Sequence, residues 1–221
     1  MASTPFLARR DALETYFDRT AAQAWEQLTS DAPVSGIRAT VRAGRDRMRA
    51  TLLGWLPEDL RGCRLLDAGC GTGALAVEAA KRGAAVTAID IAGSLVDIAE
   101  RRAEGLPIDW QVGDMLDPAL GRFDFVVAMD SLIHYRAEDI ATTTATLLAR
   151  TNGALLFTIA PRTPALAAMH AIGKLFPRSD RSPAIEPVAP ARLKALLPAP
   201  VAREARVTSG FYISHALELR A

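Results

Sequence analysis

Residues 64–74 read Arg64-Leu-Leu-Asp-Ala-Gly-Cys-Gly-Thr-Gly-Ala74, and this stretch decides the fold. A short apolar run ends in an acid and is followed by three alternate glycines, Gly69, Gly71 and Gly73. Glycine tolerates positive φ and leaves room for a close approach, so the pattern predicts a buried strand that turns sharply into a helix. Amides at the start of that helix, expected over residues 73–81, would face a ligand above the turn. The stretch therefore predicts a nucleotide site.

The acid before the glycines indicates which nucleotide is bound. The spacing Gly69-x-Gly71-x-x-Ala74 also satisfies the loose dinucleotide fingerprint, so the glycines alone discriminate poorly. Asp67 would repel a pyrophosphate at this turn, whereas it would attract the ammonium group of S-adenosylmethionine, which carries no phosphate. The sequence favours S-adenosylmethionine. A turn that binds nothing and a nicotinamide-dependent oxidoreductase are the alternatives.

Composition narrows the class of protein. The chain has 221 residues, of which 50% are hydrophobic, and a formal net charge of +1. This length fits one α/β domain with a small attachment, and the charge balance argues against disorder and nucleic-acid binding. Cys63 and Cys70 flank one strand, which argues against a disulfide or a zinc site. We expect a cytoplasmic protein, because no run reaches the length of a signal peptide or a membrane span.

Two helices are expected before the first strand. The first covers residues 5–31, where Leu13 and Phe17 belong to one apolar face, and the second covers residues 37–55 and ends before Pro57. The other face of the second helix carries four arginines, Arg38, Arg42, Arg45 and Arg49. This arginine stripe is either a solvated face or a surface for an anionic ligand, partner or headgroup.

After the glycine turn the pattern alternates between strand and helix. Four further strands are expected, at residues 85–89, 108–112, 123–129 and 154–159. Helices are expected to begin near Gly93 and to cover residues 166–176 and 190–197. Residues 205–219 predict two strands joined at Ser209-Gly210, which fits a sheet whose last strand is reversed.

Two strand ends carry further candidates. Asp90 follows the second strand about twenty residues after the glycine turn, where an acid can bind both hydroxyls of a ribose. Capping of the helix near Gly93 is the alternative for this acid. The loop after the fourth strand begins at Asp130 and contains His134. Ligands of open α/β sheets collect beyond the carboxyl ends of strands, so this loop is expected to face the transferred methyl group.

The segment Asp67-Ala-Gly-Cys-Gly-Thr-Gly73 resembles the first motif of the class I S-adenosylmethionine-dependent methyltransferases. The resemblance implies a Rossmann-like α/β fold with a seven-stranded, mostly parallel sheet and a reversed last strand. Asp114 would accept a hydrogen bond from the exocyclic amine of adenine, and Met115 would offer its backbone amide. The implied cofactor residues are Asp67, Gly69, Gly71, Gly73, Asp90, Ile91, Asp114, Met115 and Asp130.

Stretches along nearly the whole chain resemble the magnesium-protoporphyrin IX methyltransferase family. They are Tyr16-Phe17 followed by Trp25, and residues 41–45, 131–135, 175–183 and 209–214. The resemblance implies methyl transfer from S-adenosylmethionine to one propionate of magnesium-protoporphyrin IX, in chlorophyll or bacteriochlorophyll biosynthesis. It implies a helical lid over residues 1–60, a methyltransferase domain over residues 61–221 and a substrate-covering insertion around residues 162–200. Hand-over from the porphyrin-carrying subunit of magnesium chelatase and peripheral membrane contact are further expectations.

The chemistry of a propionate narrows the candidate catalytic residues. A propionic acid titrates near pH 4.3, as glutamate does, so the attacking oxygen is already an anion and needs no strong general base. Charge disappears as this anion meets the sulfonium, so a clamped cation would stabilise the ground state more than the transition state. His134 is expected to orient the propionate or to accept its proton, and Tyr16 to close over the pocket. A packed histidine and a core aromatic are the alternatives.

Four further residues are expected to bind the substrate. Phe17 and Trp25 would line the apolar cleft that a flat macrocycle needs, and Arg178 and Arg181 would bind the second propionate unless they lie in a solvated loop. No ligand cluster for a protein-bound metal is visible, so the magnesium would belong to the substrate. Rival acceptors are a quinone or another small acid, and a catalytically silent S-adenosylmethionine-binding partner is a further alternative.

Overall fold

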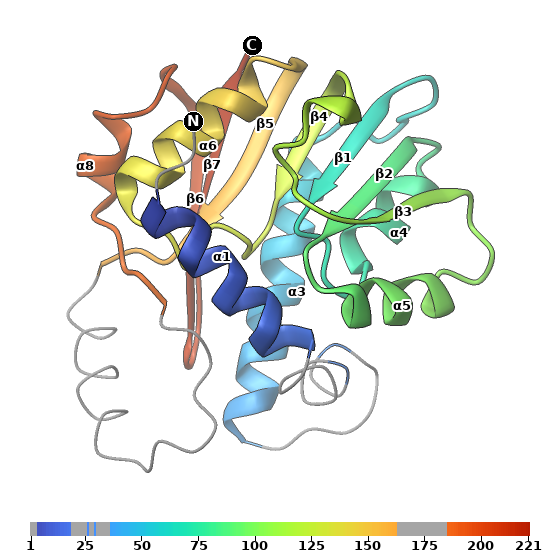
Figure 1. Ribbon diagram of the computed structural model, residues 1–221, viewed down its shortest axis with the longest axis horizontal. Helices are drawn as coiled ribbons and strands as arrows, with labels where there is room; N and C mark the ends of the chain where they lie inside the picture. Colours follow the sequence, from blue (N-terminus) through green and yellow to red (C-terminus); the bar gives the residue numbers. More distant parts are fainter. Residues whose placement is uncertain (1–3, 19–25, 27–28, 30–35, 163–184) are drawn as a thin grey trace.

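The computed structural model describes residues 4–18, 26, 29, 36–162 and 185–221. In these ranges seven strands form one sheet in the order β3-β2-β1-β4-β5-β7-β6 (Figure 1). The strands are β1 (Arg64–Ala68), β2 (Ala85–Asp90), β3 (Ile108–Val112), β4 (Phe123–Ala128), β5 (Thr151–Ile159), β6 (Val201–Ser209) and β7 (Tyr212–Arg220). Pairings among β1 to β5 are parallel, whereas β7 runs antiparallel to both β5 and β6. The expected sheet with a reversed last strand is confirmed.

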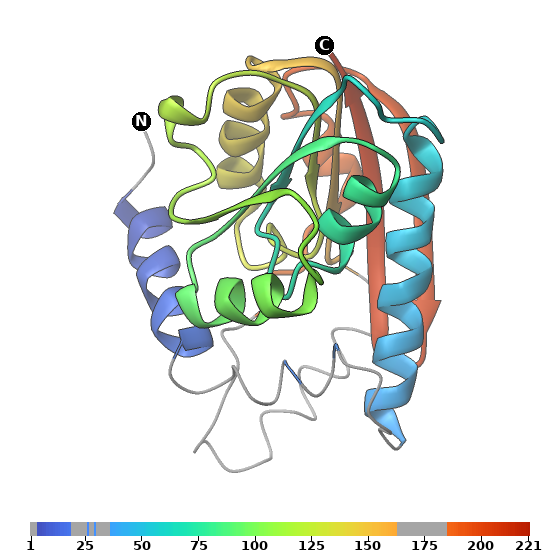
Figure 2. The ribbon, with the colours of Figure 1, turned by 90° about the vertical axis from the view of Figure 1, so that its right-hand side faces the viewer.

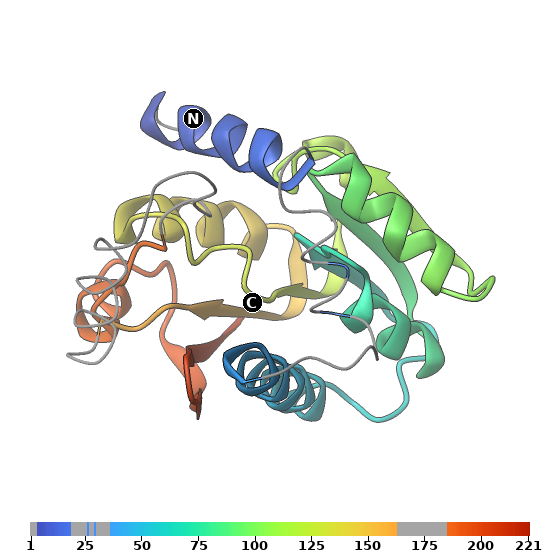
Figure 3. The ribbon, with the colours of Figure 1, turned by 90° about the horizontal axis from the view of Figure 1, so that it is seen from below.

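Helices pack on both faces of this sheet. They are α1 (Thr4–Tyr16), α3 (Ile37–Trp55), α4 (Ala74–Lys81), α5 (Gly93–Arg102), α6 (Ala137–Leu148) and α8 (Pro190–Lys194), with a short 3-10 turn, η2 (Pro118–Leu120). Figures 2 and 3 show α1 and α3 on opposite sides of the sheet. Helix α3 is the second expected helix, and it begins and ends at the residues that the sequence indicated.

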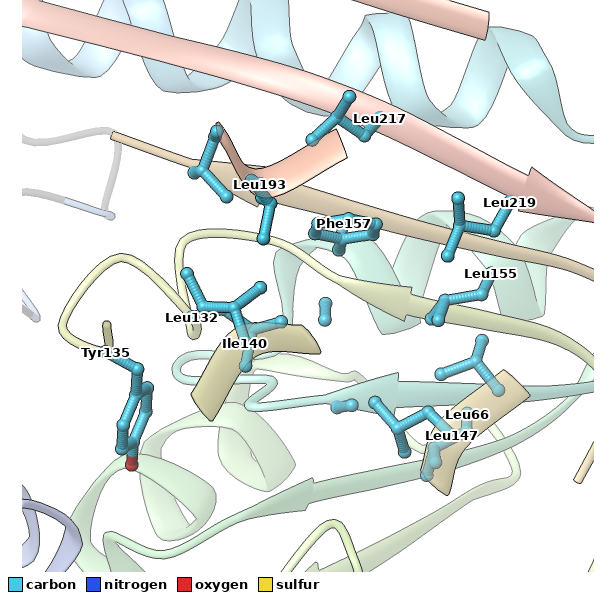
Figure 4. Packing of buried hydrophobic residues seen from close by; sticks show 14 of the residues in the cluster. Leu66, Leu132, Tyr135, Ile140, Leu147, Leu155, Phe157, Leu193, Leu217 and Leu219 are labelled. Atoms are coloured by element: carbon cyan, nitrogen blue, oxygen red, sulfur yellow. The ribbon is translucent and has the colours of Figure 1, made fainter. Parts of the chain in front are cut away.

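Alternation along the strands divides the core into two layers. In β1, Leu65 packs with Met48 and Leu52 of α3, while the next residue, Leu66, faces the opposite layer. Figure 4 shows Leu66 in that second layer, which contains side chains of α6, α8 and β7. Such runs of consecutive buried residues are typical of parallel strands that are covered on both faces.

The order of the strands positions the site. Strand β1 lies between β2 and β4, and the chain order of the strands changes direction at this point. Adjacent connections leave such a point on opposite faces of the sheet, which opens a crevice at the carboxyl ends of the strands. The loops that follow β1, β2, β3 and β4 meet at this edge.

Some element boundaries differ from the sequence predictions. Strand β5 begins three residues earlier than expected, at Thr151, and the terminal hairpin begins at Val201 rather than near residue 205. Helix α6 was not predicted, because its threonines obscure the helical pattern. Thr144 is fully buried and donates its hydroxyl to the Ile140 carbonyl at 2.9 Å, which satisfies this polar group within the helix. The helix expected over residues 166–176 lies outside the described residues.

Candidate active site

The glycine turn connects β1 to α4 and forms the floor of the site. Gly69, Gly71 and Gly73 have φ values of 81°, 52° and 77°, in the region that favours glycine. A Cβ atom on Gly69 would lie 2.4 Å from Cβ of Ser131, and one on Gly73 would lie 2.5 Å from the Trp110 ring. The turn thus requires glycine for its backbone conformation and for the close approach of its neighbours.

Two buried acids support this turn. Asp67 is 2% exposed and accepts a hydrogen bond from the Ala76 amide of α4 at 3.1 Å. Asp90 accepts hydrogen bonds from the amides of Gly71 at 2.8 Å and Ala92 at 3.0 Å. Burial raises the pKa of Asp67 to about 7, against the effect of the Ala76 amide, and burial also raises the pKa of Asp90. A cationic ligand would favour the ionised form of either acid.

A cavity of about 730 Å³ extends over the turn and along the carboxyl ends of the strands. Most of the predicted cofactor residues line it, namely Asp67, Gly69, Gly71, Asp90, Ile91, Asp114, Met115 and Asp130. Gly73 instead lies against Trp110 and Ala99, where it allows α4 and α5 to approach. The cavity therefore joins loops from four strands into one site.

Asp114 is held from two sides. Its Oδ1 accepts a hydrogen bond from the Leu116 amide at 2.8 Å, and its Oδ2 accepts one from Arg10 of α1, also at 2.8 Å. The side chains of Asp114 and Arg10 both line the cavity. Arg10 was not among the predicted site residues, because its partner is 104 positions away along the chain.

Asp130 belongs to a polar cluster that joins α3, β5 and β7. Its φ of 56° is unusual for a residue other than glycine, and it turns the chain sharply after β4. Its carboxylate accepts hydrogen bonds from Arg45 at 2.8 Å, from the Tyr212 hydroxyl at 3.0 Å and from Thr158 at 3.2 Å. Burial and the Asp130 charge raise the pKa of Tyr212, which keeps the phenol protonated as a donor.

The arginine stripe of α3 therefore has more than one environment. Arg45 is directed inward to Asp130, and Arg49 forms an ion pair with Asp46 at 2.8 Å, while Arg38 is exposed. Arg42, Arg45 and Arg49 all line the cavity. Neither a solvated face nor a surface for an anionic ligand describes the whole stripe.

His134 lies in the wall of the cavity and is 6% exposed. Its ring is 6.3 Å from the Phe17 ring at 67°, and the Phe17 ring is 5.2 Å from Tyr16 at 78°. Phe17 lines the cavity, whereas Tyr16 is not among the described residues that do so. Trp25, Arg178 and Arg181 lie outside the described residues.

No group of three or more His, Cys, Asp or Glu in the described ranges could hold a metal ion. Within the same part of the chain no helix combines the length and the apolar character needed to cross a membrane.

The strand order, the glycine turn and the acids at the carboxyl ends of β1, β2 and β3 define a class I S-adenosylmethionine-dependent methyltransferase. A family model described as a methyltransferase domain matches residues 65–152. A second model, described as the C-terminus of magnesium-protoporphyrin IX methyltransferase, matches residues 128–221. The chain is 53% identical over 218 residues to magnesium-protoporphyrin O-methyltransferase of Rhodobacter capsulatus, and the match covers 96% of each chain. It belongs to the magnesium-protoporphyrin O-methyltransferase family.

Two further comparisons bear on the fold and on the rival acceptor. The crystal structure of magnesium protoporphyrin IX methyltransferase from Synechocystis with bound SAH superposes with a TM-score of 0.85 at 27% identity, covering 95% of this chain and 98% of that chain. A ubiquinone biosynthesis O-methyltransferase of Xanthomonas oryzae is 33% identical over 177 residues, which are 75% of this chain and 71% of the relative. Likeness to the quinone enzyme is thus weaker and shorter.

Proposed function

We propose that this chain transfers the methyl group of S-adenosylmethionine to a propionate carboxylate of magnesium-protoporphyrin IX, giving the monomethyl ester. The observation that carries the proposal is the 53% identity to the Rhodobacter capsulatus relative over almost the entire chain. The glycine turn supports the choice of S-adenosylmethionine as the methyl donor, because the adjacent acid, Asp67, suits an ammonium group.

The reaction exchanges one bond for another. A propionate oxygen attacks the methyl carbon, and the S–C bond breaks with its electron pair moving to sulfur, so an ester and neutral S-adenosylhomocysteine form. The protein must hold oxygen, carbon and sulfur in line and exclude water. Buried His134 is suited to orient the oxygen. The charge of Arg45, which also lines the cavity, is opposed by Asp130, and this limits the positive charge that would favour the ground state.

We propose that α1 is the part of the N-terminal lid that covers the cofactor. Leu13 of α1 is 3% exposed and lines the cavity with Phe17. Helix α3, by contrast, packs against the sheet with Met48 and Leu52 fully buried. We further propose that Tyr16 acts in closure, that Trp25, Arg178 and Arg181 bind the substrate, and that residues 162–200 form a covering insertion.

The proposed substrate is a flat and poorly soluble macrocycle. We therefore propose that it arrives from the porphyrin-carrying subunit of magnesium chelatase, or through peripheral contact with a membrane. Co-purification with that subunit and flotation with anionic vesicles would separate these two routes.

A comparison of acceptors tests the proposed function. Purified protein is incubated with S-adenosylmethionine and either magnesium-protoporphyrin IX or a demethylated quinol. The proposal predicts the monomethyl ester together with an equal amount of S-adenosylhomocysteine. Methylation of the quinol alone would instead support the rival acceptor.

A further inference from the structure

Helix α1 is fixed over the site by contacts in its last turn and just after its end. Leu13 is buried in the cluster that contains Leu132 and Tyr135, beyond the end of β4. Just after α1, Asp18 accepts hydrogen bonds from the amide of Ser94 at 3.0 Å and from its hydroxyl at 2.9 Å. These contacts do not involve the two adjacent arginines of the helix, Arg9 and Arg10.

Arg9 contacts the loop that carries His134. Its Nη1 donates to the backbone carbonyl of His134 at 2.6 Å and lies 3.4 Å from Oε2 of Glu186. The amide of Glu186 in turn donates to the carbonyl of Ile133 at 2.9 Å. Two successive carbonyls of the loop are thus held from outside, which restrains the backbone that sets the direction of the His134 ring.

Arg10 contacts a different loop. Its Nη1 donates to Asp114 at 2.8 Å, while the other oxygen of that carboxylate accepts from Leu116. Partial burial opposes the charged form of Arg10, but the charge of Asp114 and the hydrogen bond to it raise the pKa of the guanidinium, so Arg10 stays positively charged. Neighbouring side chains of one helix therefore reach the loop of the proposed adenine reader and the loop of the proposed orienting histidine.

We propose that Arg9 is a positioning residue for His134, acting through the backbone carbonyl, and that Arg10 fixes Asp114 on the cofactor side. The inference rests on the proposed function. Its consequence is that docking of one helix sets both sides of the reaction, the donor through Asp114 and the acceptor through His134. Displacement of a reacting group by about 1 Å can cost about a hundredfold in rate, so a single charged hydrogen bond to this loop can matter for turnover.

Matched substitutions at the two adjacent positions test the proposal. Arg9→Met and Arg10→Met each remove one positive charge and keep an unbranched side chain. For Arg9→Met we expect kcat at saturating substrates to fall about tenfold or more, with the Kd for S-adenosylhomocysteine changed by less than about twofold. For Arg10→Met we expect the larger change in Kd, a rise of about threefold or more. Arg9→Lys, whose ammonium can still donate to the carbonyl, should recover most of the lost kcat.

The proposal is overturned if both variants change kcat and Kd by similar factors, because the arginines would then only dock α1. It is also overturned if Arg9→Met keeps the wild-type kcat, or if Arg9→Lys is as slow as Arg9→Met. Failure of the proposed function would be seen separately, because the wild-type protein would then form no monomethyl ester. The Kd is measured by calorimetry with S-adenosylhomocysteine alone and does not depend on the acceptor.

Discussion

Asp67 combines complete burial with a position at the edge of the cofactor cavity. Burial raises the pKa of its carboxyl group to about 7, so a large fraction is protonated at neutral pH. An ammonium group beside it would favour the ionised form and displace the proton. Affinity for S-adenosylhomocysteine should therefore fall as the pH drops below 7, by up to about tenfold per pH unit.

Calorimetry in buffers of different ionisation enthalpy measures this linkage, because the released proton is taken up by the buffer. Asp67→Asn should abolish the proton release and flatten the dependence on pH. A wild-type affinity that is constant between pH 5.5 and 7.5, with no proton exchange, would contradict the role of Asp67.

His134→Ala tests the proposed acceptor side of the site. We expect kcat to fall by about a hundredfold, since the oriented contact to the propionate is lost, while the Kd for S-adenosylhomocysteine changes little. Initial rates and calorimetry give the two quantities. His215→Ala is the matched control, because His215 lies in β7, bonded to Glu204 outside the cavity, and should keep the wild-type kcat. Equal loss of cofactor affinity and turnover in His134→Ala would count against the assignment.

Residues with local sequence signals could be predicted, and residues defined by distant partners could not. Gly69, Gly71, Asp90 and Asp114 lie at the carboxyl ends of strands, where a local pattern could place them, and they line the cavity. Their roles in cofactor binding stay predictions. Arg45 reaches Asp130 across 85 positions, and Tyr212 reaches the same acid across 82. No pattern along the chain predicts such a contact, since it exists only after the sheet has formed.

Among the elements, α3 offers a direct test of its packing against β7. A Cβ atom on Gly44 would lie 2.5 Å from Cδ1 of Tyr212, whereas one on Gly54 of the same helix would meet nothing within 4 Å. Gly44→Ala should destabilise the protein by about 1–3 kcal/mol through overpacking. Gly54→Ala should stabilise it by up to about 1 kcal/mol through the higher helix propensity of alanine.

Urea denaturation of both variants measures the two effects. The displaced Tyr212 ring also carries the hydroxyl that donates to Asp130, so Gly44→Ala should lower turnover as well. Equal free energies of unfolding of the two variants would contradict the close packing of Gly44 in α3 against Tyr212 in β7.

The boundaries of elements were predicted best where the local pattern was unambiguous. Strand β3 begins and ends at the expected residues, and so does α3. Helix α6 was missed because threonine favours strands and turns when its environment is unknown, and only burial against β5 and α8 makes the helix the better structure. The secondary structure of α6 therefore depends on tertiary packing, because the propensities of its residues do not specify a helix.

At the scale of the whole molecule, ligand binding should report which nucleotide the crevice accepts. A ligand at a hundred times its Kd adds about 2.7 kcal/mol of stability, which for a protein of this size raises the Tm by roughly 5–10 °C. We expect this rise with S-adenosylhomocysteine and none with NAD at the same concentration, as measured by scanning fluorimetry. A larger shift with NAD would revive the dinucleotide alternative.

The sheet could be predicted as a whole because the glycine motif resembles that of the class I methyltransferases, whose sheet the resemblance implies, and because the terminal hairpin fits its reversed last strand. The position of α1 could not, because an amphipathic helix only predicts that some apolar surface covers Leu13 and Phe17. Its placement across the carboxyl ends of the strands depends on Asp114, Ser94 and the carbonyl of His134, which come together at one edge only in the folded chain.

The central claim is that a propionate oxygen receives the methyl group of S-adenosylmethionine. The most direct test is the carbon NMR spectrum of the product formed from magnesium-protoporphyrin IX and S-adenosylmethionine labelled with ¹³C in its methyl group. We predict one enriched signal at the chemical shift of a methyl ester, with one label per macrocycle. An enriched methyl on carbon or nitrogen of the ring, or an unlabelled macrocycle beside a fully active donor, would contradict it.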